Sequence, residues 1–205
     1  MANEIQKAEP PALPLAPEQY NRPFMDQNSN VLRLFFNRLT ASINTLLSTD
    51  NGGKFLYMPS ALLYSTTDQT AAVVNTGYPV EFENTYLARG VSIVSDTRIT
   101  VSADGVYNFQ VTLQTDHVGG SDATITTWIN KNGTDVPYGG QQQTVKGNSI
   151  HAVFWNFSID LTVGQYIEMY WATDDTSLTL DTQPAASPHP GIPSAIVAVS
   201  FVSNL

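Results

Sequence analysis

The 205-residue chain contains no cysteine. This absence excludes disulfide cross-links, thiolate zinc sites and cysteine nucleophiles, so stability has to come from packing, either within the chain alone or with oligomerisation in addition. Charged residues are also scarce, at 13%, whereas an average soluble domain has about 25%. Serine, threonine, asparagine and glutamine take their place, and these residue types favour the turns and polar strand faces of an all-β protein.

Long apolar runs are missing as well. No segment reaches the roughly 18 apolar residues that a membrane-spanning helix needs, and the N-terminus lacks the apolar stretch of a signal peptide. We therefore expect no membrane partner. Positively charged residues are few: the chain has 9 lysines and arginines but 18 aspartates and glutamates, which gives a net charge of -9. This charge opposes attraction to phosphate backbones, so we expect no nucleic-acid partner either.

Prolines are concentrated at the start of the chain, at positions Pro10, Pro11, Pro14, Pro17 and Pro23. Proline at this density prevents helix formation and favours an extended, polyproline-like backbone. We therefore predict an extended anchoring arm over residues 1–25. Its apolar anchors for a partner surface are Leu13, Leu15, Tyr20 and Phe24. A disordered tail is the alternative that such a composition allows.

The next segment, 26–50, is predicted to contain the one helix of the chain, from about Asp26 or Ser29 to Leu47. Apolar residues repeat in it at alternating spacings of four and three, namely Leu32, Phe36, Leu39, Ile43 and Leu46. This spacing is that of a short coiled-coil seam. An amphipathic helix packed on the protein's own β-structure explains the same stripe equally well.

After a connector over residues 51–70, the head domain over 71–205 shows short apolar runs separated by turn signals. We predict strands near 70–75, 80–82, 90–93, 98–101, 105–114, 123–131, 141–145, 149–161, 165–173, 177–180 and 195–201. About ten strands at this spacing, with no helical pattern, are typical of a β-sandwich. The predicted fold class is therefore all-β, an antiparallel jelly-roll sandwich preceded by the arm and the helix.

The run 149–161 has bulky apolar residues on both faces of its predicted strand. Val153, Trp155 and Phe157 share one face, and Phe154 lies on the other. In a monomeric sandwich the outer face of a strand should be solvated. Another subunit is the simplest second cover, so this run and the heptad spacing together predict an oligomer.

Several motifs of the head follow one another in an order that points to a known superfamily. They are ITVSADGVYNFQVTLQ, with Gly105, Tyr107 and Phe109, then WINKNGT, then HAVFWNFSIDLTVGQYIEMYW, and finally AIVAVSFVSNL. They resemble the glycine-x-tyrosine-x-phenylalanine strand, the Lys-Asn-Gly turn, the paired strands and the apolar last strand of the tumour necrosis factor and complement globular-head superfamily. Gln165 departs from the pattern, because an aspartate is usual at its position.

The N-terminal portion has a different likeness. Its proline-rich start and the run PEQYNRPFMDQNSNVLRLFFNRL are similar to the opening of small virion proteins of tailed bacteriophages, especially those of marine and cyanobacterial hosts. In those proteins such a start precedes a variable β-rich head. The two resemblances together imply a homotrimer with an N-terminal anchor on the virion, whose last strand lines the three-fold axis. The expected trimer interface consists of Phe154, Trp155, Tyr166, Tyr170, Val197, Val199 and Phe201.

No catalytic motif is visible in the sequence. His117, His151 and His189 lie in separate segments without metal-binding spacing and are expected at the surface. Neither a GxSxG elbow nor a phosphate-binding loop occurs. A glycosidase needs two carboxylates facing one cleft, and the available acids are Asp160, Glu168, Asp174, Asp175 and Asp181. We interpret these acids as solvated loop residues, so no catalytic residue and no cofactor is expected.

A calcium site is a second possibility for the acidic stretch ATDDTSLTLDT. Asp174, Asp175 and Asp181 are its candidate ligands, because calcium prefers several carboxylate oxygens. The spacing matches no EF-hand.

The leading hypothesis is thus a non-enzymatic virion structural protein, attached to capsid or tail, of the decoration or fibre type. The first alternative is a receptor-binding head that recognises host cell-surface polysaccharide through loops at 117–122 and 135–143. A glycan hydrolase is the third hypothesis. Fold alone does not separate them, because function depends on the site rather than on the scaffold.

Overall fold

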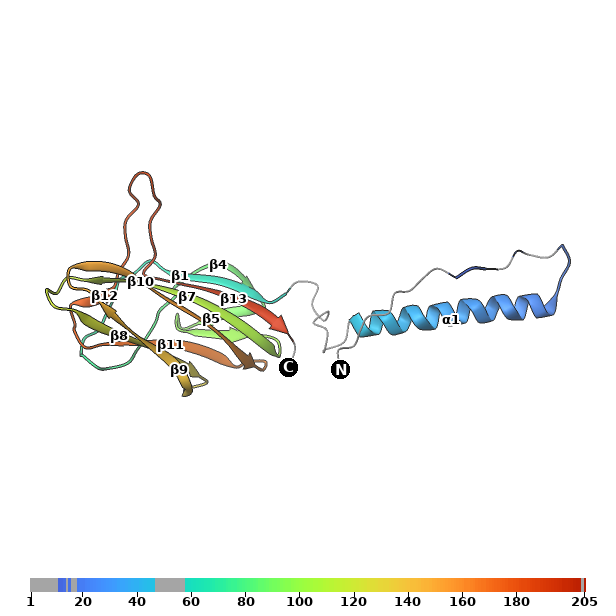
Figure 1. The fold of residues 1–205 in the computed structure, drawn as a ribbon, viewed down its shortest axis with the longest axis horizontal. Helices are drawn as coiled ribbons and strands as arrows, with labels where there is room; N and C mark the ends of the chain where they lie inside the picture. The colour runs from blue at the N-terminus through green and yellow to red at the C-terminus, as the bar shows by residue number, and fades with distance from the viewer. Residues whose placement is uncertain (1–10, 14, 16–17, 47–57, 204) are drawn as a thin grey trace. The chain divides into compact units, whose positions relative to one another are not determined.

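The computed structural model describes residues 11–13, 15, 18–46, 58–203 and 205. The chain divides into two compact units, Met1–Leu56 and Tyr57–Ser203. The first contains the helix α1 and the second contains the strands β1 to β13 (Figure 1). Within the described residues, no helix is both long and apolar enough to cross a bilayer.

Helix α1 spans Arg22–Leu46 and begins earlier than the sequence predicts. The side-chain oxygen of Asn21 accepts a hydrogen bond of 3.2 Å from the backbone N–H of Phe24, which makes Asn21 the N-cap. Pro23 is tolerated because the first N–H groups of a helix have no intrahelical acceptor. The predicted arm over 1–25 is therefore too long, and Phe24, assigned to it as an anchor, belongs to the helix. The predicted end at Leu47 lies outside the described residues.

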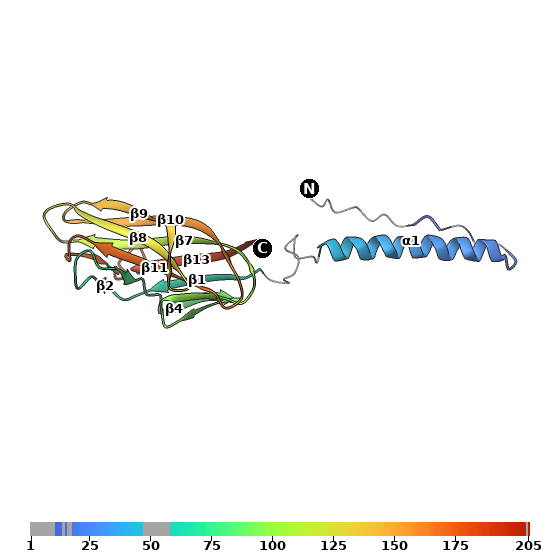
Figure 2. The same cartoon turned by 90° about the horizontal axis from the view of Figure 1, so that it is seen from below.

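The head unit consists of two antiparallel sheets in two layers, as the two views of Figures 1 and 2 show. Sheet A contains β1 (Ser60–Ser65), β2 (Gln69–Thr70), β4 (Asn84–Arg89), β7 (Gly105–His117), β10 (Ser149–Leu161), β12 (Leu178–Leu180) and β13 (Ala195–Ser203). Sheet B contains β3 (Tyr78–Pro79), β5 (Val91–Val94), β6 (Arg98–Val101), β8 (Ala123–Lys131), β9 (Thr134–Val145) and β11 (Tyr166–Thr173).

The chain passes repeatedly from one sheet to the other. It leaves sheet A after β7, forms β8 and β9 in sheet B, returns for β10, crosses again for β11 and ends in sheet A with β12 and β13. Crossings of this kind are those of a jelly roll. The predicted fold class, an all-β antiparallel sandwich, is confirmed.

The head begins earlier than predicted. Strand β1 lies inside the predicted connector 51–70 and pairs with both β13 and β4, so it is a central strand of sheet A. The N-terminal part of that connector lies outside the described residues. Strand β4, over Asn84–Arg89, was not predicted at all.

The core lies between the two sheets and is filled by the inward side chains of both. Its largest buried members include Trp171, Tyr107, Phe82 and Phe109. The hydroxyl of Tyr107 donates a hydrogen bond of 2.9 Å to the carbonyl oxygen of Ala103. Burial, followed by the charge of Asp104, raises the pKa of Tyr107 to about 12, so this hydroxyl stays protonated and remains a donor.

The register of the strands places the entry and exit of the head at one end. Ser60, the first residue of β1, pairs with Ser200 near the end of β13, and Gly105 pairs with Leu161 at the same end of β7. His117 marks the opposite end of β7, where it pairs with Ser149. We call this opposite end, with the turns 118–122, 146–148 and 174–177, the distal end.

Candidate interaction site

The sheet A outer face consists of the outward side chains of β10, β7, β13 and β1, which align in rows across the four strands. One central row is Phe154, Thr112, Ile196 and Tyr64. The next row is Asn156, Gln110, Ala198 and Leu62. The rows join strands that are far apart in sequence, so this face exists only once the sheet has formed.

This face carries little charge. Among the outward residues of these four strands, only Asp116 and Asp160 are charged, and they occupy opposite ends of β7 and β10. The Lys131 ammonium lies 3.1 Å from the Asp160 carboxylate and lowers the pKa of that carboxyl by hydrogen bonding and by its charge. The centre of the face is neutral on a chain whose net charge is -9.

The polar side chains of this face bond to one another. The Asn108 amide donates to the side-chain oxygen of Asn156 at 2.7 Å and to the hydroxyl of Ser158 at 3.2 Å. The Gln110 amide in turn donates to the side-chain oxygen of Asn108 at 3.4 Å. Because these amides already have partners within the chain, covering them costs less than burying free polar groups would.

Phe154 is the exposed apolar residue of the central row. Its relative exposure is 69%, although phenylalanine is usually a core residue. The outward position of Phe154 and the inward position of Val153, Trp155 and Phe157 confirm that β10 has bulky apolar side chains on both faces.

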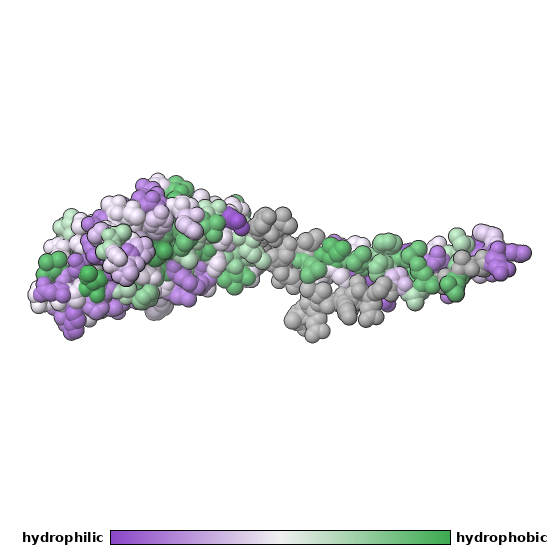
Figure 3. Space-filling view, turned by 90° about the horizontal axis from the view of Figure 1, so that it is seen from above, coloured by the Kyte–Doolittle hydropathy of each residue, from purple (hydrophilic) through white to green (hydrophobic). Residues whose placement is uncertain are grey.

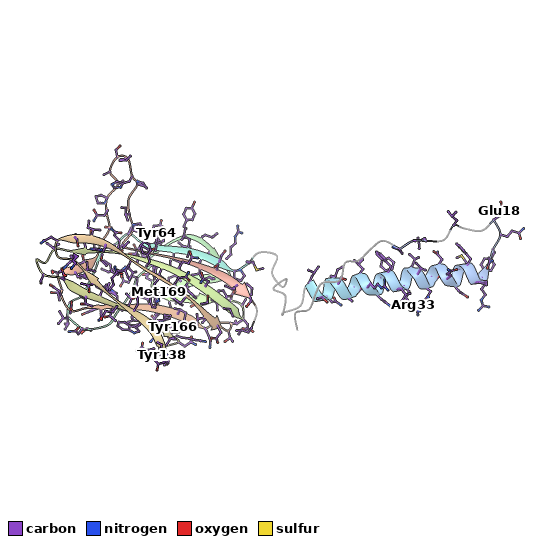
Figure 4. All side chains as sticks on the ribbon, in the orientation of Figure 1. Glu18, Arg33, Tyr64, Tyr138, Tyr166 and Met169 are labelled. Atoms are coloured by element: carbon purple, nitrogen blue, oxygen red, sulfur yellow. The ribbon has the colours of Figure 1, made fainter. Side chains whose placement is uncertain are left out.

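A pocket of about 330 Å³ lies beside Tyr64, in the same row as Phe154. Its lining residues come from β1, from the turn directly after β1 and from the loop between β12 and β13, and are Tyr64, Thr66, Thr182, Gln183, Pro184, Gly191, Ile192 and Pro193. We call residues 182–193 the finger. Figure 1 shows the finger as a narrow loop standing off the head, and Figure 4 labels Tyr64 on the same side. Isolated bridges Gln183–Ile192 and Ala186–His189 hold its two limbs together.

The predicted helix seam lies on α1, and no residue of α1 is buried. Phe36, Ile43 and Leu46 are 57%, 43% and 45% exposed, while Leu32 and Leu39 are half-buried. The earlier helix start adds Met25, seven residues before Leu32, to the same seam. Figure 3 shows green hydrophobic side chains along α1.

The predicted arm anchors are largely exposed. Leu15 and Tyr20 are 94% and 83% exposed, and Leu13 is 49% exposed. Their burial, if the arm does act as an anchor, has to come from a partner.

The residues of the predicted trimer interface lie in three different places of the head and do not form one surface. Val197, Val199 and Phe201 are buried in the core of their own subunit. Trp155 also faces inward, with its ring centroid 5.0 Å from that of Phe157. Only Phe154 lies on the sheet A outer face. The sequence does not show that Val197, Val199 and Phe201 face the core. Both faces of β13 carry apolar residues, so the alternation along this strand does not tell which face is buried.

Tyr166 and Tyr170, the other two predicted interface residues, lie on the outward side of sheet B. Tyr170 stacks on Trp128 with ring centroids 5.6 Å apart, and the Arg98 guanidinium lies 4.8 Å above the Tyr166 ring. Tyr138 extends fully into solvent on the edge strand β9 (Figure 4). Residues 135–143 thus form a strand of sheet B rather than the predicted recognition loop.

The distal end is organised around His117, which was predicted at the surface and is fully buried. Its Nε2 lies 3.4 Å from a carboxylate oxygen of Asp175. The backbone N–H and the hydroxyl of Ser177 both donate to the other oxygen of Asp175, and these bonds lower the pKa of that carboxyl. His117 and Asp175 therefore tie the turn 174–177 to the end of β7.

The three calcium candidates do not converge. Asp174 accepts a hydrogen bond of 2.7 Å from the backbone N–H of Thr124, Asp175 is held as just described, and Asp181 accepts one from the Gln183 amide. The part of the chain that the structure describes contains no group of three histidine, aspartate or glutamate side chains able to hold a metal ion.

The acids considered for a glycosidase are likewise dispersed. Asp160 lies on the sheet A outer face, Glu168 is buried on sheet B within 3.4 Å of Arg98, and Asp174 and Asp175 lie at the distal end. This dispersal gives no support to a paired-carboxylate mechanism, which needs two acids across one cleft.

Comparison with known proteins does not assign the chain to a family. No protein-family model matches the sequence, and no curated protein matches it at a significant level.

Proposed function

We propose that the protein is a non-enzymatic, homotrimeric structural protein of a tailed-bacteriophage virion. In this proposal the arm and α1 attach it to the capsid or tail, and the jelly-roll head is displayed outward. The observation that carries the proposal is the sheet A outer face. The centre of this face is neutral, its polar side chains bond to one another, and the Phe154 side chain is exposed on it.

Electrostatics is compatible with self-association through this face. Copies with a net charge of -9 repel one another, so a stable contact between them needs a region where the charge is absent. The sheet A outer face provides such a region, and its amides need no new partners. An interface of this kind becomes convincing when it buries more than about 1,000 Å² around a desolvated aromatic centre.

The N-terminal unit supports the same assembly. The N-terminal unit by itself leaves the apolar seam of α1 unburied, and a coiled coil is one arrangement that buries a heptad-spaced seam. The assignment to a virion rests on the likeness of the first part of the sequence to virion proteins, and the exposed anchors Leu15 and Tyr20 agree with an attachment role.

Two measurements test the proposal. Light scattering of the purified full-length chain at micromolar concentration should give three times the chain mass, and a monomer would contradict the trimer. Cryo-electron microscopy of the native particle should show the head as a three-fold density anchored through the arm. A chain that is absent from purified particles would refute the virion role.

A receptor-binding head is the second candidate, favoured by the outward side of sheet B. The stacked pair Trp128–Tyr170 and the exposed Tyr138 stay accessible when the sheet A outer face is covered. Exposed aromatic rings bordered by polar groups, here Asp135 and Gln142, are suited to stacking against sugar rings. Binding of host surface polysaccharide should then weaken in Tyr138→Ala, and unchanged binding would exclude this surface.

A further inference from the structure

We propose that Phe154 of one copy inserts into the pocket beside Tyr64 of the next copy, so that the heads join head to tail in a closed ring. This inference rests on the proposed homotrimer and names the contact that forms it. It follows from an exposed aromatic ring on β10 and an open pocket beside β1, three strands away on the same face.

The ring of Phe154 is largely uncovered by the described residues of the head. It is 69% exposed in a neutral row of the sheet, and removing an aromatic ring from water is favourable. Phe154 lies in the paired strand β10, so its backbone is already ordered before the ring is buried and little further backbone entropy is lost.

The pocket has the size and the chemistry to receive that ring. A cavity of about 150 Å³ is enough to hold a benzene molecule, and the pocket measures about 330 Å³. Its walls include the apolar groups of Tyr64, Ile192 and Pro193. The hydroxyls of Thr66 and Thr182 already donate to Glu83 and Asp68, so an apolar guest leaves neither of them without an acceptor.

The two features cannot meet within one chain. Phe154 on β10 and Tyr64 on β1 are separated by β7 and β13, and three strand spacings of about 4.8 Å place them roughly 14 Å apart. A ring and a pocket at two places on one face can meet reciprocally between two copies about a two-fold axis, or head to tail around a ring. A three-fold rotation is the case that closes as the proposed trimer.

Cysteine cross-linking tests this contact in the full-length chain. The protein has no cysteine of its own, so every disulfide in a variant is an engineered one. The double variant Phe154→Cys/Ile192→Cys should give, after mild oxidation, a non-reducing gel ladder that ends at the trimer, whereas neither single variant should cross-link.

The matched control moves one cysteine along the same face of the same strand. Ile150 is also outward and 50% exposed, but it lies four residues from Phe154, or about 13 Å along the strand. A disulfide needs Cα atoms within about 7 Å. The double variant Ile150→Cys/Ile192→Cys should therefore stay uncross-linked.

A truncation measures the energy of the same contact. Phe154→Ala should raise the dissociation constant of the trimer about tenfold or more, as loss of a central aromatic anchor does, while the melting temperature of the dissociated chain stays unchanged. Val163→Ala removes another exposed apolar side chain, at 64% exposure on a turn, and should leave the dissociation constant unaltered.

The outcomes separate the inference from the proposed function. A trimeric wild type with no Phe154→Cys/Ile192→Cys cross-link, or with equal cross-linking of the control pair, would overturn the inference and leave the trimer standing. A ladder that continues beyond the trimer would refute the closed ring. A monomeric wild type would refute both.

Discussion

Gly105 sits on β7 against the ring of Phe201, at the start of the glycine-x-tyrosine-x-phenylalanine motif. A Cβ atom at this position would clash with Cε2 of Phe201 and would lie 2.7 Å from the carbonyl oxygen of Ser203. Gly105→Ala should therefore displace β13 and lower the free energy of unfolding by about 1–3 kcal/mol, as overpacking of a filled core does. Urea denaturation followed by tryptophan fluorescence measures the change.

Gly120 supplies the matched control. No atom lies within 4 Å of a Cβ placed there, so Gly120→Ala should change the free energy of unfolding by less than about 0.5 kcal/mol. Equal effects of the two substitutions would contradict the packing explanation for Gly105.

Asp181 should make the head less stable as the pH rises, which is the opposite of the usual effect of an aspartate. Partial burial, and then the nearby charge of Asp68, raise the pKa of the Asp181 carboxyl. A raised pKa means that the ionised form is less favourable in the fold than in the unfolded chain, so stability is lost as pH rises through the pKa. Asp181→Asn should raise the melting temperature at about pH 7, and the gain should vanish below about pH 4.

Asp122 serves as a control, because the pKa of its carboxyl is shifted in the opposite direction. The hydrogen bond from Lys146 lowers the pKa of its carboxyl, so its contribution is present at neutral pH and is lost as pH falls through the lowered pKa. Asp122→Asn should slightly lower the melting temperature at neutral pH, with the difference disappearing in acid. Parallel pH curves for the two variants would refute the assigned directions.

At the scale of elements, α1 offers a direct test of the coiled-coil seam. Ile43→Asp places a charge within the seam and should dissociate the helices or weaken the trimer by at least tenfold, because burying an unpaired charge in the seam is costly. Sedimentation velocity measures the mass of the assembly.

Asn44→Asp introduces the same charge next to the seam, on an exposed position of the same helix. It should leave the mass unchanged. Dissociation by both variants would point to overall repulsion rather than to the seam.

Elements with a clean pattern were predictable from the sequence. β6, β8 and β10 have the predicted bounds, since their apolar residues are flanked by turn signals. β4 was missed because almost all of its residues are exposed and show no alternation. The start of α1 was missed because Pro23 reads as a helix breaker, although a first-turn position tolerates it.

The candidate site was only partly predictable. Phe154 was identified because β10 has apolar residues of both parities, a property that the local sequence shows. The pocket was not, because Tyr64 and Ile192 are 128 residues apart and meet only through the pairing of β1 with β13. The burial of His117 also depends on the distal turns and has no local signature.

At the scale of the whole molecule, the neutral interface predicts how salt affects assembly. Salt screens the repulsion between copies of net charge -9, and a contact through apolar and amide groups has no ion pairs to lose. The trimer should therefore be as tight or tighter at about 0.5 M than at about 0.05 M sodium chloride. Weakening at high salt, measured by sedimentation equilibrium, would indicate an interface built on ion pairs instead.

The pairing of Ser60 with Ser200 has a practical consequence. Because the chain enters and leaves the head at one end, the turns at the other end carry no connection to an anchor. In the proposed assembly, a peptide inserted at Gly120, where the surroundings are open, would be presented at the end of the head opposite to the chain entry, in one copy per subunit. The head would then serve as a scaffold for multivalent display, and the lack of cysteine would leave every added thiol free for site-specific labelling.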